Sequence, residues 1–129
     1  MYKIFLTIFL MHMFAGFFLQ SKRISKLKAE KIIYLFGHVG LYTLVFIVLS
    51  PILLGLSYEE GLVYSLINGV LHFIVDFFTG KVKKRISDLD TKRTLIVLID
   101  YTLHLIILTA TYVCIYPSAM YRITFWDVV

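Results

Sequence analysis

The stretch LHFIVDFFTGK, residues 71–81, places a histidine and an aspartate four residues apart in an otherwise apolar run. It belongs to a longer hydrophobic segment, Leu62–Phe78, whose length is near the ~17–25 residues of a membrane-crossing helix. Inside a bilayer, ionisable side chains such as those of His72 and Asp76 are costly and usually mark a site. The stretch therefore predicts a transmembrane helix that carries functional polar residues.

The composition of the whole chain supports this prediction. Of its 129 residues, 60% are hydrophobic and 16% are charged, and the mean hydropathy is +0.86. Soluble domains contain roughly 45–50% apolar and roughly 25% charged residues. The length allows one domain and no separate soluble module. We therefore expect an integral membrane protein with a single transmembrane domain over residues 1–129.

Four hydrophobic runs predict an all-α, polytopic bundle of four transmembrane helices. The expected helices cover approximately residues 3–20, 31–55, 58–80 and 92–116. Ser57 and Glu60 have the spacing of a capping box that opens the third helix, and Gly80 is placed to end it. The polar stretch SKRISKLKAEK, residues 21–31, is consistent with a short amphipathic helix on the membrane surface.

The charged residues between these runs predict the orientation of the chain. Basic residues fill the loops after the first and third runs, whereas the turn after the second run holds Glu59 and Glu60. By the positive-inside rule, both basic loops face the cytoplasm and both termini face outward. The net charge of +5 comes mainly from these loops. We therefore expect them to contact membrane lipids through anionic head groups and not to bind nucleic acid.

The predicted helices share a layer of polar side chains. One histidine falls in each of them: His12, His38, His72 and His104. At about 1.5 Å of rise per residue, all four lie ~10–16 Å from the cytoplasmic helix ends, in one layer. Asp76 and Asp100 lie four residues nearer the cytoplasm than His72 and His104, on the same helical faces. We expect the two pairs to face each other across the third and fourth helices.

Imidazoles and carboxylates that converge in this way form a mixed nitrogen and oxygen ligand set. Such a set suits zinc, manganese or iron, and helical bundles build dinuclear centres from comparable motifs. The predicted metal ligands are His72, Asp76, Asp100 and His104. His12 and His38 are predicted as catalytic acid and base or as further ligands, for hydrolysis by a metal-activated water. Gln20 and Asn68 are predicted to orient the ligands.

Two other functions fit the same residues. Without metal, buried histidines and aspartates can form a proton relay or a pathway for metal ions, as in a transporter. Such a transporter is expected to be a homo-oligomer, because four helices alone leave little room for alternating access. In a non-catalytic membrane interaction protein, by contrast, the polar layer only holds the helices in register through hydrogen bonds. The metal content of the purified protein separates this last alternative from the enzyme.

The polar pattern resembles a bacterial integral-membrane family labelled domain of unknown function 3307. The residues that carry the resemblance are His12 with FFLQ at 17–20, His38, His72 with Asp76, and Asp100 with His104. Two positions depart from the family pattern, because Gly16 stands where the family has aspartate and Tyr101 where it tends to have glutamine. The resemblance implies the architecture and a bacterial origin, whereas the family has no settled activity.

This family in turn looks akin to small membrane proteins described as metal-dependent hydrolases. Gly16 removes one carboxylate from the ligand set that the resemblance implies, and this predicts that the chain binds metal weakly or not at all. The leading hypothesis is a metal-dependent hydrolase of the bacterial cytoplasmic membrane that acts on a lipid-linked or amphipathic phosphate or ester. Its site is expected in the cytoplasmic half of the bilayer.

Overall fold

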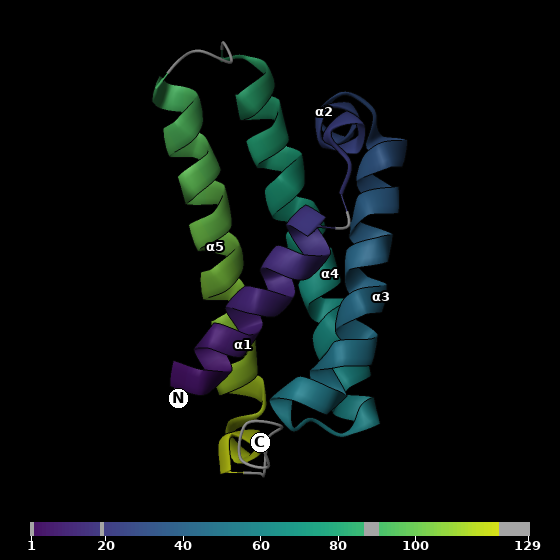
Figure 1. The fold of residues 1–129 in the computed structure, drawn as a ribbon, viewed down its shortest axis with the longest axis vertical. Helices are drawn as coiled ribbons and strands as arrows, with labels where there is room; N and C mark the ends of the chain where they lie inside the picture. Colours follow the sequence, from purple (N-terminus) through teal and green to yellow (C-terminus); the bar gives the residue numbers. More distant parts are fainter. Residues whose placement is uncertain (1, 19, 87–90, 122–129) are drawn as a thin grey trace.

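The computed structural model describes residues 2–18, 20–86 and 91–121, and no β-strand occurs among them (Figure 1). The fold is therefore all-α, as predicted. In chain order the elements are α1 (Tyr2–Met13), the π-helical turn η1 (Phe14–Phe18), α2 (Lys22–Glu30), α3 (Ile32–Leu54), α4 (Tyr58–Lys84), α5 (Thr91–Ile115) and the short 3₁₀ helix η2 (Pro117–Tyr121).

Three of these helices are long and apolar enough to cross a membrane: α3 with 23 residues, α4 with 27 and α5 with 25. A crossing takes about 20 predominantly apolar residues. The first helix, α1, has 12 residues and continues only through the turn η1. These lengths fit a helical membrane bundle and suggest a membrane protein, while the count of four crossings stays a prediction.

The long helices run side by side, and the two short ones lie across them. Figure 1 shows α3, α4 and α5 along the length of the molecule, with α1 crossing in front of α4 and α5. In this view α2 is seen nearly end-on, and it packs against α3 and α4. We call the end that holds α2 and the C-terminus of α4 the basic end. The start of α1 and η2 lie at the opposite end.

Local sequence signals explain where two helices begin. The Ser21 hydroxyl accepts a hydrogen bond from the Ile24 amide at 3.2 Å and so caps α2. The predicted capping box of α4 is confirmed: the Ser57 amide donates to the Glu60 carboxylate at 2.8 Å, and the Glu60 amide donates to the Ser57 hydroxyl at 3.2 Å. A short helix within residues 21–31 is confirmed as well.

The predicted end of the third helix at Gly80 is wrong, because α4 continues to Lys84. Gly80 is buried, and a Cβ atom at this position would lie 3.6 Å from the Cα atom of Ala29. Gly80 faces Ala29 of α2 at ordinary van der Waals distance, so this position lies in the contact between α2 and α4. The glycine therefore serves helix packing and does not terminate the helix.

Four aromatic side chains fill the bundle beyond the histidine layer, on the side away from the basic end. They are Tyr42, Phe46, Tyr64 and Tyr112, and each is at most 1% exposed. Two of the buried hydroxyls are satisfied by backbone carbonyls, since Tyr64 donates to Leu108 at 3.0 Å and Tyr112 donates to Leu54 at 2.8 Å. We call these four side chains the aromatic floor.

Candidate functional site

The four histidines meet in one buried layer directly above the aromatic floor. Their side chains come from α1, α3, α4 and α5, and their residues are 3–6% exposed. The ring centroids of His72 and His104 are 4.2 Å apart, those of His38 and His72 are 5.3 Å apart, and those of His12 and His104 are 5.2 Å apart. Helices that are distant in sequence therefore deliver imidazoles to a single point.

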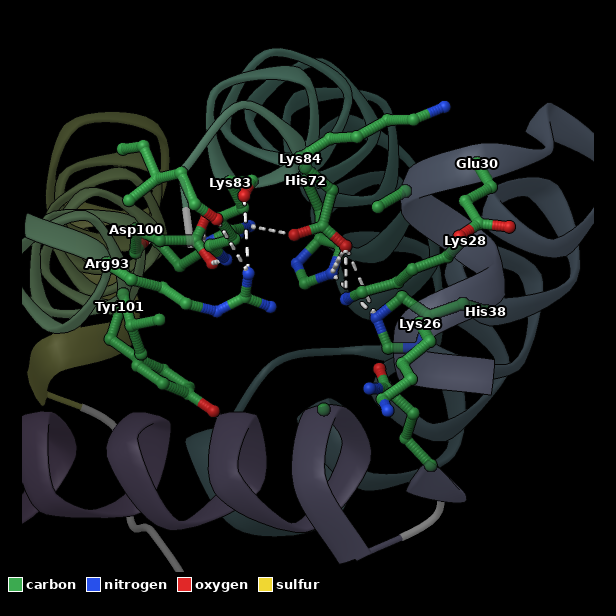
Figure 2. Close-up of a pocket in the computed structure, with 18 of the residues that line it drawn as sticks. Lys26, Lys28, Glu30, His38, His72, Lys83, Lys84, Arg93, Asp100 and Tyr101 are labelled. Carbon is green, nitrogen blue, oxygen red and sulfur yellow. Dashed lines mark hydrogen bonds and ion pairs between the residues drawn. The ribbon is translucent and has the colours of Figure 1, made fainter. Parts of the chain in front are cut away.

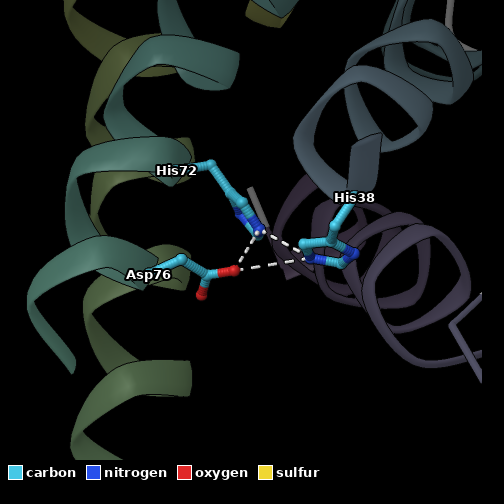
Figure 3. A group of neighbouring side chains, drawn as sticks. All are labelled: His38, His72 and Asp76. Atoms are coloured by element: carbon cyan, nitrogen blue, oxygen red, sulfur yellow. Dashed lines mark hydrogen bonds and ion pairs between the residues drawn. The ribbon is translucent and has the colours of Figure 1, made fainter. Parts of the chain in front are cut away.

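One group of three ligands joins α3 to α4, and we call it the α3–α4 triad (Figure 3). The Nε2 atoms of His38 and His72 are 3.2 Å apart, and they lie 3.5 and 3.4 Å from Oδ2 of Asp76. Ligand atoms ~2.0–2.1 Å from a tetrahedral metal are about 3.3–3.4 Å apart. The triangle therefore has the dimensions of three ligands around one metal ion.

A second group, which we call the α4–α5 triad, consists of Asp76, Asp100 and His104, with ligand atoms within 4.8 Å of one another. Nδ1 of His104 lies 2.7 Å from the Asp100 carbonyl oxygen and must donate to it, because a carbonyl only accepts. In the neutral ring, Nε2 then keeps its lone pair, and this atom is 3.8 Å from Oδ1 of Asp76. Nε2 is buried without a hydrogen-bond partner among the described residues, as expected for a ligand atom.

The predicted ligand set therefore comes together at the α4–α5 interface, and Asp76 is shared by both triads. One carboxylate oxygen of Asp76 faces His38 and His72, while the other faces His104. The sequence predicts His38 as a catalytic residue or a further ligand, and its position beside His72 favours the role of ligand. A carboxylate shared in this way is suited to bridge two metal ions.

His12 lies beside the triads and belongs to neither of them. Its Nδ1 atom is 3.1 Å from the Tyr42 hydroxyl, which fixes the orientation of the ring. The Tyr42 ring also stacks on His72, with centroids 4.0 Å apart. Tyr42 therefore positions two of the four histidines. This role was not predicted from the sequence, although Tyr42 follows His38 by four residues on α3 and so shares its helical face.

Two lysines at the basic end contact the two aspartates. Lys28 of α2 places its Nζ atom 2.8 Å from Oδ2 of Asp76. Lys83 of α4 places its Nζ atom 2.5 Å from Oδ2 of Asp100, whose Oδ1 accepts a hydrogen bond from the Thr79 hydroxyl at 2.7 Å. The charge pattern of the sequence predicts that both lysines set the orientation of the chain and contact anionic lipid head groups. In the structure they also neutralise the buried carboxylates.

The two residues predicted to orient the ligands are placed differently. Asn68 donates to the Tyr64 carbonyl of its own helix at 2.8 Å, because its amide turns back along α4 instead of toward the histidines. Gln20 lines the cleft described below. Among the described residues, neither side chain is hydrogen-bonded to a histidine or an aspartate of the layer. No direct hydrogen bond to a ligand therefore supports the predicted orienting role of Gln20 and Asn68 among the described residues.

A cleft of about 890 Å³ leads from the basic end to the histidine layer (Figure 2). Its inner wall holds all four histidines and both aspartates. Its mouth is basic and is lined by Lys26, Lys28, Lys83, Lys84 and Arg93. In Figure 2, Lys28 points toward His38, whereas Lys84 points away from the histidines. The cleft is thus a polar chamber with ligand-type residues at its base and cations around its opening.

Comparison with known proteins relates the chain to one family. The model of a family described as "Protein of unknown function (DUF3307)" matches residues 4–128, which include both triads and the cleft. No curated protein and no solved structure matches the chain. The chemistry of the site must therefore be inferred from the geometry of its own residues.

Proposed function

Because the chain belongs to the DUF3307 family, whose description assigns it no activity, we propose a function from the geometry of its own side chains. The proposed function is that of a metal-dependent hydrolase that acts on a lipid-linked or amphipathic phosphate or ester. The substrate enters the cleft from the basic end, and the reaction takes place at the histidine layer. The metal is zinc, manganese or iron, the ions that mixed imidazole and carboxylate sites prefer.

The size of the α3–α4 triad is the observation that carries this proposal. Its three inter-ligand distances of 3.2, 3.4 and 3.5 Å lie close to those of a tetrahedral site. Two imidazoles and one carboxylate form the kind of three-residue set that catalytic zinc sites use, with a fourth position left for water or substrate. His38, His72 and Asp76 would hold the metal, and a metal held there would lower the pKa of that water and so supply a nucleophile.

The other residues of the layer complete a reaction site. Asp76 presents its second oxygen to the α4–α5 triad, which supports a second and looser metal position beside the first. His12 lies within the same layer, with its ring held by Tyr42 and outside both triads. This position suits a general acid or base that transfers a proton to or from the substrate.

We place the protein in the bacterial cytoplasmic membrane with the basic end in the cytoplasm and both termini outside. The concentration of lysines at the mouth of the cleft supports this orientation through the positive-inside rule. Reporter fusions near Lys26 of α2 and near Lys84 at the end of α4 should therefore report the cytoplasm. A fusion after Val129 should report the outside, and a cytoplasmic signal from it would reverse the orientation.

The aromatic floor favours an enzyme over a transporter. A transport pathway needs polar access from both ends of the bundle, whereas Tyr42, Phe46, Tyr64 and Tyr112 close the interior beyond the histidines. A purely structural polar layer is the second candidate, and one observation favours it: Lys28 and Lys83 neutralise both aspartates without any metal. The two candidates differ in whether the purified protein binds metal.

The test is the metal content of the protein purified in phosphatidylcholine nanodiscs and incubated with zinc. We expect up to two zinc ions per chain, and zinc-dependent hydrolysis of p-nitrophenyl phosphate. His12→Gln should keep the zinc and lower the hydrolysis rate by ~10²–10⁴-fold, as loss of a general acid or base does. His38→Gln should lose the zinc of the α3–α4 triad as well as activity. A wild-type protein that binds no zinc, manganese or iron would leave the structural layer as the function.

A further inference from the structure

We propose that Lys28 and Lys83 are exchangeable cations that pass from the aspartates to a phosphate group of the substrate when metal enters. Without metal they neutralise Asp76 and Asp100. With metal bound, they face the cleft and hold the substrate. This inference rests on the proposed function, and it adds the chemical group that is recognised and the order in which metal and substrate bind.

The competition is most direct at Asp76. The Nζ atom of Lys28 lies 2.8 Å from Oδ2, the same oxygen that faces His38 and His72 at 3.5 and 3.4 Å. A divalent ion bound by that oxygen would stand within a few ångströms of the ammonium group. Like charges at this distance repel strongly in a partly desolvated site. Metal entry into the α3–α4 triad therefore expels the ammonium of Lys28.

The same exchange applies at Asp100 with a different partner. Lys83 contacts Oδ2 of Asp100 at 2.5 Å, while Thr79 donates to Oδ1 at 2.7 Å. A neutral hydroxyl donor is compatible with a metal-bound carboxylate, whereas an ammonium group is repelled by the ion. Metal in the α4–α5 triad therefore displaces Lys83 and leaves Thr79 in place.

Both lysines can leave without a change in the fold. Their side chains are 19% and 20% exposed, whereas the carboxylates they contact are 4% and 9% exposed. The ammonium groups thus reach the aspartates from the open side of the cleft, on long flexible stems. Rotation of these stems carries each ammonium into the mouth of the cleft while α2 and α4 stay where they are.

The charge balance of the cleft identifies the ligand. Five basic side chains line it against three carboxylates, those of Glu30, Asp76 and Asp100. Once Asp76 and Asp100 bind metal, the displaced ammonium groups and the metal leave the site strongly positive. A phosphate group has enough oxygens to contact the metal and both ammonium groups together. Because metal entry creates this anion site, metal and phosphate are expected to strengthen each other's binding.

The experiment measures zinc and phosphate affinity in Lys28→Met, Lys83→Met and a control, Lys81→Met. The control removes a cation of α4 whose ammonium lies over the Phe77 ring at 3.9 Å, outside the cleft. In phosphatidylcholine nanodiscs, the two cleft variants should bind zinc more tightly than wild type, because a competitor is gone. Their zinc-loaded forms should bind inorganic phosphate about tenfold more weakly or worse, as expected for a lost charged hydrogen bond. The control should change neither affinity.

Arginine variants keep the charge and provide a check against loss of folding. Lys28→Arg and Lys83→Arg should restore phosphate binding. Zinc binding that is the same in wild type and in both methionine variants would overturn the exchange while leaving the metal centre intact. Phosphate binding without zinc at full affinity would overturn it too. If no form binds zinc, the proposed function falls, and the exchange falls with it.

A competition experiment distinguishes a lipid head group from a soluble phosphate compound as the ligand of the site. Adding phosphatidic acid to the nanodiscs should weaken the binding of inorganic phosphate by zinc-loaded wild type if the site takes a lipid head group. Unchanged phosphate binding would assign the site to soluble phosphate compounds. Either result supports the phosphate site, provided that Lys28→Met and Lys83→Met weaken phosphate binding.

Discussion

Asp76 and Asp100 each lie four residues from a histidine on their own helix, but their other partners come from different parts of the chain. Asp76 receives Lys28 from α2 and faces His38 of α3 as well as His72 of α4. Its other oxygen faces His104 of α5, so side chains from four helices surround this one carboxylate. Its surroundings form only when the whole bundle has assembled.

Asp100 is held by one neighbouring helix instead. Its two oxygens are bound by Thr79 and Lys83, which lie one turn apart on α4. In the α4–α5 triad, Nε2 of His104 lies 3.8 Å from Oδ1 of Asp76, which is longer than the 3.2–3.5 Å between the ligand atoms of the α3–α4 triad. The comparison shows a tight centre built by long-range packing beside a looser one built by a helix pair. Binding strength should follow the same order.

The largest effect is expected from Asp76→Asn, which breaks both triads at once. The amide keeps the size of the side chain but loses the ligating charge, so both metal positions should empty. We expect zinc affinity to fall beyond the ~10–100-fold typical of residues that only support a ligand. Zinc content per chain measures it. The matched control is Glu59→Gln at an exposed position, and equal zinc in Asp76→Asn and in the control would exclude Asp76 as a ligand.

A smaller effect is expected from Asp100→Asn, which breaks only the α4–α5 triad. His38, His72 and Asp76 remain, so the tighter metal position should stay filled while the second is lost. Zinc titration should then show one site with affinity close to that of the wild type. Loss of both sites would instead mean that the two triads act as one unit, and the distinction between the aspartates would disappear.

The smallest effect is expected from Asn68→Ala. The amide of Asn68 donates a hydrogen bond to the Tyr64 carbonyl of its own helix, and not to a ligand. Its removal should change zinc affinity by less than the ~10-fold lower limit for residues that support a ligand. The same titration measures it. A drop as large as that of Asp100→Asn would restore the orienting role that the spacing predicts.

Local spacing explains which parts of the site are predictable. Residues four apart on a helix share a face, so the sequence alone pairs His72 with Asp76 and Asp100 with His104. The capping box at Ser57 depends only on residues close in the chain and is predictable for the same reason.

The contacts of Lys28 and Lys83 with the aspartates were not predicted from the sequence, for two different reasons. The position of Lys83 could be predicted from helical spacing, because Lys83 lies seven residues after Asp76 and four after Thr79 on the same helical face. Because Lys83 stands among other basic residues, the simpler interpretation is that it faces solvent and helps to set the orientation of the chain. The contact of Lys28 with Asp76 could not be predicted, because it depends on how α2 packs against Gly80 of α4. Packing of that kind leaves no periodic signal in the sequence.

The aromatic floor has a consequence for the membrane around the protein. A cleft that brings water and ionisable groups deep into a bilayer threatens the barrier that holds an ion gradient. In the proposed membrane placement, Tyr42, Phe46, Tyr64 and Tyr112 would interrupt a chain of water molecules below the histidines, because their rings are buried and the hydroxyls of Tyr64 and Tyr112 are hydrogen-bonded to the backbone. The floor would then limit the leakage of protons across the bundle while polar chemistry takes place inside it.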